Sequence, residues 1–173
     1  MSRDRHWLAT LVLLAVVAPG VACGGADRPE VLGPRGDTPG RRLPWPEATT
    51  PVGDWSFAAG EQEVALETRS RRGRSSVTVW SVVVGGKLYV ATDDGRERKR
   101  WVTQIERDPE ARIGIRERTY PVRARSVRAP EEWDAVMQAF GKKYGSQIAK
   151  YDFPRAGDTS RGRVFELAPR SRS

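Results

Sequence analysis

The residues best suited to chemistry in this sequence are basic and lie in two clusters. The run Arg69–Arg74 holds four arginines, and Arg98, Lys99 and Arg100 form the second cluster. Guanidinium groups bind phosphate oxygens through paired hydrogen bonds, so the first cluster could hold a phosphate group. For the first cluster, a solvated turn is the alternative interpretation. A net charge of +8 over 173 residues also favours an anionic partner.

Two residue counts limit the catalytic chemistry. The only histidine is His6 and the only cysteine is Cys23, and both lie near the N-terminus. The rest of the chain therefore cannot form a Ser–His or Cys–His nucleophile pair, or a zinc site built from histidine or cysteine. No G-x-S-x-G nucleophile motif occurs. Any reaction must use carboxylates, lysine, tyrosine, arginine or a cofactor, and the sequence leaves open whether the protein is an enzyme.

Residues 1–22 have the pattern of an export signal, with Arg3 and Arg5 before an apolar run. The small residues before Cys23 resemble a bacterial lipobox, although Gly20 stands where leucine is usual. We expect Cys23 to carry a lipid that anchors the protein to the membrane, on the periplasmic or extracellular face of the bacterial cell envelope. The alternative is an ordinary secretory signal followed by an unused cysteine.

Residues 23–53 are rich in proline and glycine and show no apolar periodicity. Such a composition predicts an extended tether, because it offers too little apolar surface to fold. Trp45 is the only aromatic residue in this stretch, and it could dock on the domain. The folded domain is predicted to span residues 54–173.

The elements of that domain are organised around a β-hairpin. Two apolar β-branched runs, 77–84 and 87–92, are joined by Gly85 and Gly86, a strong signal for a two-residue turn. Residues 64–68 before the hairpin read as a first strand. A short basic helix follows the hairpin, with Trp101, Val102 and Ile105 on one side, and ends at Asp108; residues 111–116 and 122–127 then alternate as strands. The stretch 130–144 has a helical apolar stripe and is predicted to end at Gly145, and 163–168 reads as a closing strand. This order predicts a mainly β (α+β) fold, a six-stranded antiparallel split β-barrel with a few short helices.

The hairpin and the helices resemble a known superfamily. Residues 79–84 (VWSVVV) and 86–90 (GKLYV), followed by a basic helix ending in Asp108-Pro109, are similar to the split β-barrel group of pyridoxamine 5'-phosphate oxidase-like FMN-binding proteins and deazaflavin-dependent nitroreductases. Within that group, the chain most resembles the uncharacterised DUF2255 family, which the segments 132–136, 143–145 and 165–167 also resemble.

The resemblance implies a homodimer that binds FMN or a deazaflavin in a groove between subunits, possible oxidoreductase activity, and a cofactor phosphate held by basic and hydroxyl side chains. Carried over to this sequence, the cofactor-binding candidates are Arg74, Thr92, Lys99, Arg100 and Trp101, with Trp80 as a further neighbour of the flavin ring.

One departure from the pattern of the superfamily supports a second hypothesis. No serine or threonine lies between Asp93 and Val102, where a phosphate-binding hydroxyl is often found in this superfamily. The alternative is therefore a cofactor-free envelope module that keeps the barrel for binding or dimerisation. A nucleic-acid partner is not expected, because the aromatic residues are not interleaved with the basic ones in any recognisable nucleic-acid-binding pattern.

Overall fold

The computed structural model of the chain describes residue 40 and residues 42–92, 99–148, 154 and 162–170. The predicted export signal, the predicted lipid site at Cys23 and most of the polar loop before the basic helix lie outside the described residues.

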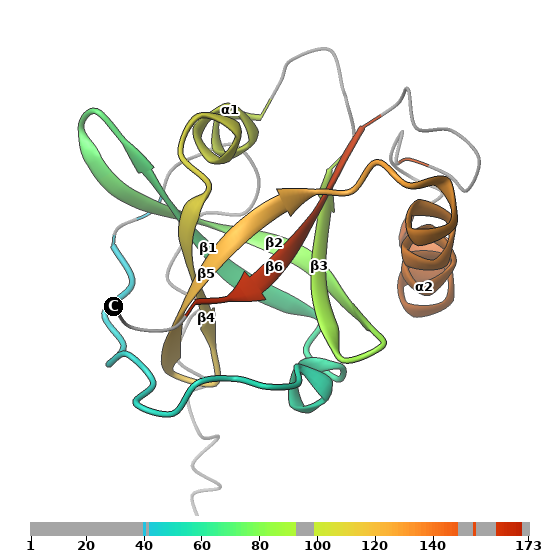
Figure 1. Cartoon of the computed structure of the whole chain (residues 1–173), viewed down its shortest axis with the longest axis horizontal. Helices are drawn as coiled ribbons and strands as arrows, with labels where there is room; N and C mark the ends of the chain where they lie inside the picture. Colours follow the sequence, from blue (N-terminus) through green and yellow to red (C-terminus); the bar gives the residue numbers. More distant parts are fainter. Residues whose placement is uncertain (1–39, 41, 93–98, 149–153, 155–161, 171–173) are drawn as a thin grey trace, which may run out of the picture.

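The described strands form one closed antiparallel barrel, as the sequence predicted (Figure 1). Neighbouring strands follow the order β1-β2-β3-β6-β5-β4, and β1 pairs with β4 to close the barrel. The core inside the barrel contains buried side chains from every strand and from the first helix. The strands are β1 (Glu63–Ser70), β2 (Gly73–Val84), β3 (Lys87–Thr92), β4 (Glu110–Ile115), β5 (Arg118–Ser126) and β6 (Arg163–Pro169).

Two tight turns define the β1-β2-β3 meander. Gly85 and Gly86 join β2 to β3 with φ angles of 56° and 75°, which is the backbone conformation that makes glycine favourable in such a turn. The β1–β2 hairpin is longer than predicted, because Ser70 pairs with Gly73 across a turn formed by Arg71 and Arg72. The sequence predicted a basic loop there. Backbone hydrogen bonds between strands do not need apolar side chains. The polar composition therefore gave no sign that the two strands extend to Ser70 and Gly73.

Helix α1 (Arg100–Arg107) closes one end of the barrel, at the same end as the β1–β2 turn (Figure 1). Its buried residues are Trp101, Val102 and Ile105, which confirms the apolar face predicted for the basic helix. The hydroxyl of Thr68 in β1 lies 2.5 Å from Gln104 Oε1 and donates a hydrogen bond that holds α1 against the barrel wall. The position of α1 is thus set by both apolar burial and a polar contact.

Helix α2 (Pro130–Ile148) packs on the outside of the barrel and buries Trp133, Val136, Met137, Phe140 and Tyr144 against a second apolar cluster. The helix was predicted to end at Tyr144. Gly145 does leave the helical conformation, with φ 30° and ψ −104°, and a further helical turn follows this kink. The end predicted from Gly145 therefore corresponds to a kink.

The segment formed by residues 40 and 42–53, here called the strap, lies against the barrel. Leu43 is buried, and the N–H of Ala48 donates to the carbonyl of Thr119 at 2.8 Å. The N–H of Thr119 in turn donates to the carbonyl of Pro46 at 3.0 Å. The proline-rich composition predicted an extended tether for this stretch and left open whether Trp45 docks on the domain. A few apolar anchors and backbone hydrogen bonds to β5 are enough to hold it in place.

After the strap, a short 3₁₀ helix η1 (Ser56–Ala58) covers the other end of the barrel. The N–H of Trp55 donates to the carbonyl of Gly86 at 2.8 Å, and the Trp55 ring packs edge-on against Tyr120. The barrel thus has α1 at one end and η1 at the other (Figure 1).

Candidate functional site

A groove lies between the tip of the β1–β2 hairpin and helix α1. It has a volume of about 530 Å³. Arginines make up much of its wall, four from the hairpin and two from α1, and hydroxyl and amide groups lie between them. We call it the arginine groove; its lining residues are Arg69, Ser70, Arg71, Arg72, Gly73, Arg74, Ser75, Arg100, Thr103, Gln104 and Arg107.

The regular geometry of two elements gathers these side chains. In the hairpin, Arg69 pairs with Arg74, so the two arginines stand opposite each other across the ladder. In α1 the lining residues are Arg100, Thr103, Gln104 and Arg107, which follow the i, i+3, i+4, i+7 spacing of one helix face. The opposite face of α1 enters the core, so the polar face necessarily points outward to the hairpin.

Positive charge in the groove exceeds the negative charge that could neutralise it. Arg69 pairs with Asp108 at 3.6 Å and Arg74 with Glu67 at 3.4 Å. Within the described part of the chain, the other four lining arginines make no ion pair. These are Arg71, Arg72, Arg100 and Arg107.

The pKa of the Arg74 guanidinium is lowered from its ordinary value, mainly by burial. Burial lowers this pKa, Glu67 raises it, and the nearby charges of Arg69, Arg112 and Arg42 lower it further. The net direction is downward, so the surrounding groups leave the cation incompletely stabilised. An anion bound beside Arg74 would relieve the repulsion between these arginines.

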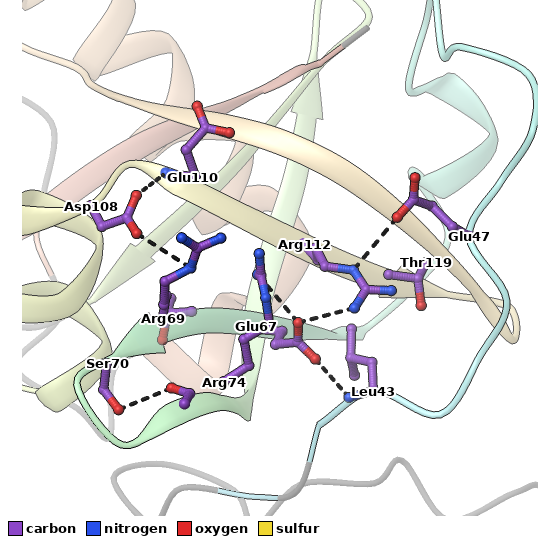
Figure 2. A network of polar contacts seen from close by, with 12 residues as sticks. Leu43, Glu47, Glu67, Arg69, Ser70, Arg74, Asp108, Glu110, Arg112 and Thr119 are labelled. Atoms are coloured by element: carbon purple, nitrogen blue, oxygen red, sulfur yellow. Dashed lines mark hydrogen bonds and ion pairs between the residues drawn. The ribbon is translucent and has the colours of Figure 1, made fainter. Parts of the chain in front are cut away.

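A buried carboxylate orients one wall of the groove. Glu67 is fully buried, and its Oε1 lies 3.4 Å from Arg74 Nη1 and 3.3 Å from Arg112 Nη1 (Figure 2). Its other oxygen accepts a hydrogen bond from the N–H of Leu43 at 2.8 Å. A buried charge is tolerated only with partners of this kind. The network therefore fixes the direction of Arg74 and ties it to the strap.

The structure brings together only two of the predicted cofactor-binding residues, Arg74 and Arg100, which both line the arginine groove. Lys99 directly precedes α1 but does not line the groove. Thr92 is buried at the end of β3, in register with Arg163. Trp101 is 4% exposed and packs edge-on against Phe165 in the core.

Trp80, the other predicted ring neighbour, lies on the α2 side of the barrel. Its ring stacks on Tyr144 with 4.6 Å between centroids and 8° between planes. No aromatic side chain of the described residues lines the arginine groove. The aromatic candidates are thus separate from the phosphate candidates.

The sequence patterns indicated no role for the groove residues of α1 beyond Arg100. No hydroxyl residue lies between Asp93 and Val102, yet Thr103 supplies one just after that point, and Ser70 and Ser75 supply two more from the hairpin. The i, i+3, i+4, i+7 spacing on α1 could have identified Thr103 and Arg107, because it places them on one face with Arg100.

Two other kinds of site were examined in the described residues. No group of three or more histidine, cysteine, aspartate or glutamate side chains is arranged there to hold a metal ion. None of the helices in this part of the chain combines the length and apolar character needed to cross a bilayer.

The sequence matches a family described as an uncharacterized protein conserved in bacteria (DUF2255), over residues 57–167. The match covers more than half of the chain. The protein belongs to the DUF2255 family. This membership confirms the family resemblance of the hairpin and helices. Comparison with curated proteins gives no match.

Solved structures show the same fold. HutZ, a heme storage protein from Vibrio cholerae, is 18% identical to this chain, with a TM-score of 0.52 over 67% of this chain and 87% of HutZ. The conserved hypothetical protein Rv2991 from Mycobacterium tuberculosis is 13% identical, with a TM-score of 0.52 over 72% of this chain and 86% of that protein. These likenesses show that this DUF2255 member shares the fold of the two proteins, in agreement with its closed six-stranded antiparallel barrel.

Proposed function

We propose that this DUF2255 protein binds a phosphorylated flavin, FMN or a deazaflavin, with the phosphate in the arginine groove. One observation carries the proposal: six arginines converge on the groove and four of them make no ion pair with another described residue. The hydroxyls of Ser70, Ser75 and Thr103 complete a donor set suited to phosphate oxygens. Family resemblance supplies the choice of a flavin as the phosphate carrier.

The groove residues fit the phosphate end of such a cofactor. Arg72 and Arg100 are exposed on opposite walls, where their guanidinium groups could bind one phosphate from two sides. Neither Trp101 nor Trp80 lines the groove, so the residues described here supply no stacking partner for the ring. When bound, a flavin would supply electron-transfer chemistry, and the residues of this chain would bind and orient it.

Heme is a weaker candidate, although HutZ is named as a heme storage protein. The usual protein ligands of heme iron are histidine, cysteine, methionine and tyrosine. The chain has one histidine and one cysteine, His6 and Cys23, and both lie outside the described residues. Met137 and the described tyrosines, Tyr89, Tyr120 and Tyr144, do not line the arginine groove. The donor set around the arginine groove instead suits an oxyanion.

A pair of titrations tests the phosphate site. FMN and riboflavin share the ring system, and only FMN carries the phosphate. We expect the chain without residues 1–22 to quench FMN fluorescence on binding and to leave riboflavin unaffected. The variant Arg100→Gln should weaken FMN binding about tenfold, the size expected for losing one charge-assisted contact. The matched variant Arg118→Gln removes a charge near the other end of the barrel and should bind FMN normally. Equal binding of FMN and riboflavin would contradict the proposal.

The alternative function is a cofactor-free envelope module that uses the barrel for binding or dimerisation. The absence of an aromatic side chain among the described residues lining the groove favours it. A chain that binds neither FMN nor a deazaflavin, and that runs as a homodimer in light scattering after gel filtration, would support this alternative. A homodimer that does bind FMN fits the first proposal.

We also propose that a lipid on Cys23 anchors the protein in the bacterial cell envelope. The motivation is the lipobox-like sequence before the only cysteine of the chain. Metabolic labelling with an alkyne fatty acid should label the native protein and leave Cys23→Ser unlabelled. Labelling of Cys23→Ser to the same level would overturn this assignment.

A further inference from the structure

The strap begins beside the arginine groove. The N–H of Gly40 donates to the carbonyl of Ser76 at 2.6 Å, and Ser76 directly follows Ser75 in the groove wall. Arg42, two residues further along the strap, is close enough to affect the pKa of Arg74. Gly40, the first residue that the structure describes, therefore lies beside the groove.

The covalent chain limits the distance between Gly40 and Cys23. At about 3.5 Å per residue, the segment from Cys23 to Gly40 spans at most about 60 Å, roughly one to two domain diameters. A lipid on Cys23 would thus keep the domain close to the membrane. The segment joins the domain beside the groove, so the arginines lie near the point at which this segment is attached.

The chemistry of the groove rim suits an anionic lipid surface. Arg71 and Arg72 form the exposed turn of the hairpin, and Arg107 is exposed on α1. Within the described residues none of the three makes an ion pair. Guanidinium groups bind the phosphate oxygens of phospholipid headgroups as they bind other phosphates. Attraction to an anionic leaflet adds to this contact, and it falls off within a Debye length.

We propose that the arginine groove face docks on anionic phospholipids of the membrane that holds Cys23, with Arg71 and Arg72 as the first contacts. The proposal rests on the lipid anchor proposed above, and it adds an orientation: the barrel lies with α1 and the β1–β2 turn toward the membrane and η1 away from it. Docking brings the groove opening to the headgroup layer, where a ligand phosphate and lipid phosphates would meet the same arginines.

The test measures the affinity of the domain for vesicles without the lipid anchor. All contacts described above lie between residues 40 and 170, so the chain from Gly24 to Ser173 retains them. This chain is sedimented with vesicles of phosphatidylcholine containing phosphatidylglycerol, and with vesicles of phosphatidylcholine alone. We expect binding to the anionic vesicles only, weakening as salt is raised.

Paired variants locate the contact. Each arginine near an anionic leaflet contributes about fivefold to binding, so Arg71→Gln with Arg72→Gln should weaken binding more than tenfold. Arg116→Gln with Arg118→Gln removes the same charge from the β4–β5 turn at the η1 end and should have little effect. Equal losses in the two double variants would show that total charge, and not this face, attracts the lipid, and would overturn the proposal.

Two further outcomes separate this inference from the proposed function. Equal binding to both kinds of vesicle would overturn the docking proposal, even where FMN titration succeeds without lipid. Loss of FMN binding in Arg100→Gln together with normal vesicle binding would support both assignments. Failure of FMN to bind any variant, with vesicle binding that depends on Arg71 and Arg72, would leave docking as the role of the groove.

Discussion

The indole ring of Trp45 lies directly against the backbone of Gly114. A Cβ atom on Gly114 would be 2.5 Å from Trp45 Cζ3 and 3.3 Å from Leu43 Cδ1, so the strap can approach β4 only because this residue has no side chain. Leu43 also donates its N–H to Glu67, so the same approach completes the polar network behind the arginine groove. The absence of a side chain at Gly114 thus allows the strap to pack on the barrel and to contact the network behind the arginine groove.

Gly114→Ala should destabilise the protein by about 1–3 kcal/mol, the usual cost of overpacking. The added methyl group must displace the Trp45 ring. The fluorescence of Trp45 should therefore also shift toward that of exposed indole. Chemical denaturation followed by fluorescence measures both. Gly141→Ala in α2 is the matched control: no atom lies within 4 Å of its Cβ position, and it should stabilise by about 0.5–1 kcal/mol. An unchanged free energy of unfolding in Gly114→Ala would mean that the strap can shift without destabilising the protein.

Glu67→Gln should be among the more damaging single changes in the barrel. It removes the charge that faces two guanidinium groups, those of Arg74 and Arg112, in a fully buried position. The expected loss is about 3–5 kcal/mol, typical of breaking a buried ion pair. Urea denaturation measures it. Glu110→Gln, which disturbs more exposed ion pairs with Arg123 and Arg170, should cost about 1 kcal/mol or less. Similar losses in the two variants would argue against a special role for the Glu67 network.

Tyr144 should make stability depend on alkaline pH. Burial raises the pKa of Tyr144 to about 12, and its hydroxyl accepts from the N–H of Ser81 at 3.0 Å and donates to the carbonyl of Gln62 at 2.7 Å. A raised folded-state pKa gives a contribution that is complete below pH of about 10, the unfolded value, and is lost as pH rises toward about 12. Wild type should therefore lose more stability than Tyr144→Phe over this range. Denaturation at several pH values tests this, and parallel pH profiles would contradict it.

Trp101 and Arg100 are neighbours in sequence with separable roles. Trp101 is buried against Phe165, so Trp101→Phe should cost about 1–3 kcal/mol of stability by leaving a cavity. The affinity of the Trp101→Phe variant for FMN should stay unchanged, because Trp101 does not line the groove. Arg100→Gln should behave in the opposite way, with stability within about 0.5 kcal/mol of wild type and weakened binding. If Trp101→Phe kept full stability but lost affinity for FMN, Trp101 would have to be part of the binding site.

Much of the barrel could be predicted from local sequence. A two-residue turn requires positive φ, which glycine adopts without strain, so Gly85 and Gly86 between two apolar runs indicate a hairpin. The apolar faces of α1 and α2 follow from helical spacing, because residues three and four apart share a face. The order of elements and the family resemblance together gave six antiparallel strands, and the structure confirms them.

What the tertiary structure decided is which distant residues meet. The arginines of the hairpin and the polar face of α1 are about 30 positions apart, and only closure of the barrel places them around one groove. Thr92 and Trp101 looked equally suited by residue type, but packing buried them, and type alone does not reveal burial. The strap is the clearest case. Its composition predicted an extended tether and left the docking of Trp45 open, because the contacts of the strap depend on Gly114 and Glu67, which are adjacent to it only in the folded protein. Local propensities determine the turns and the apolar faces of the helices, whereas long-range packing determines which distant residues come into contact.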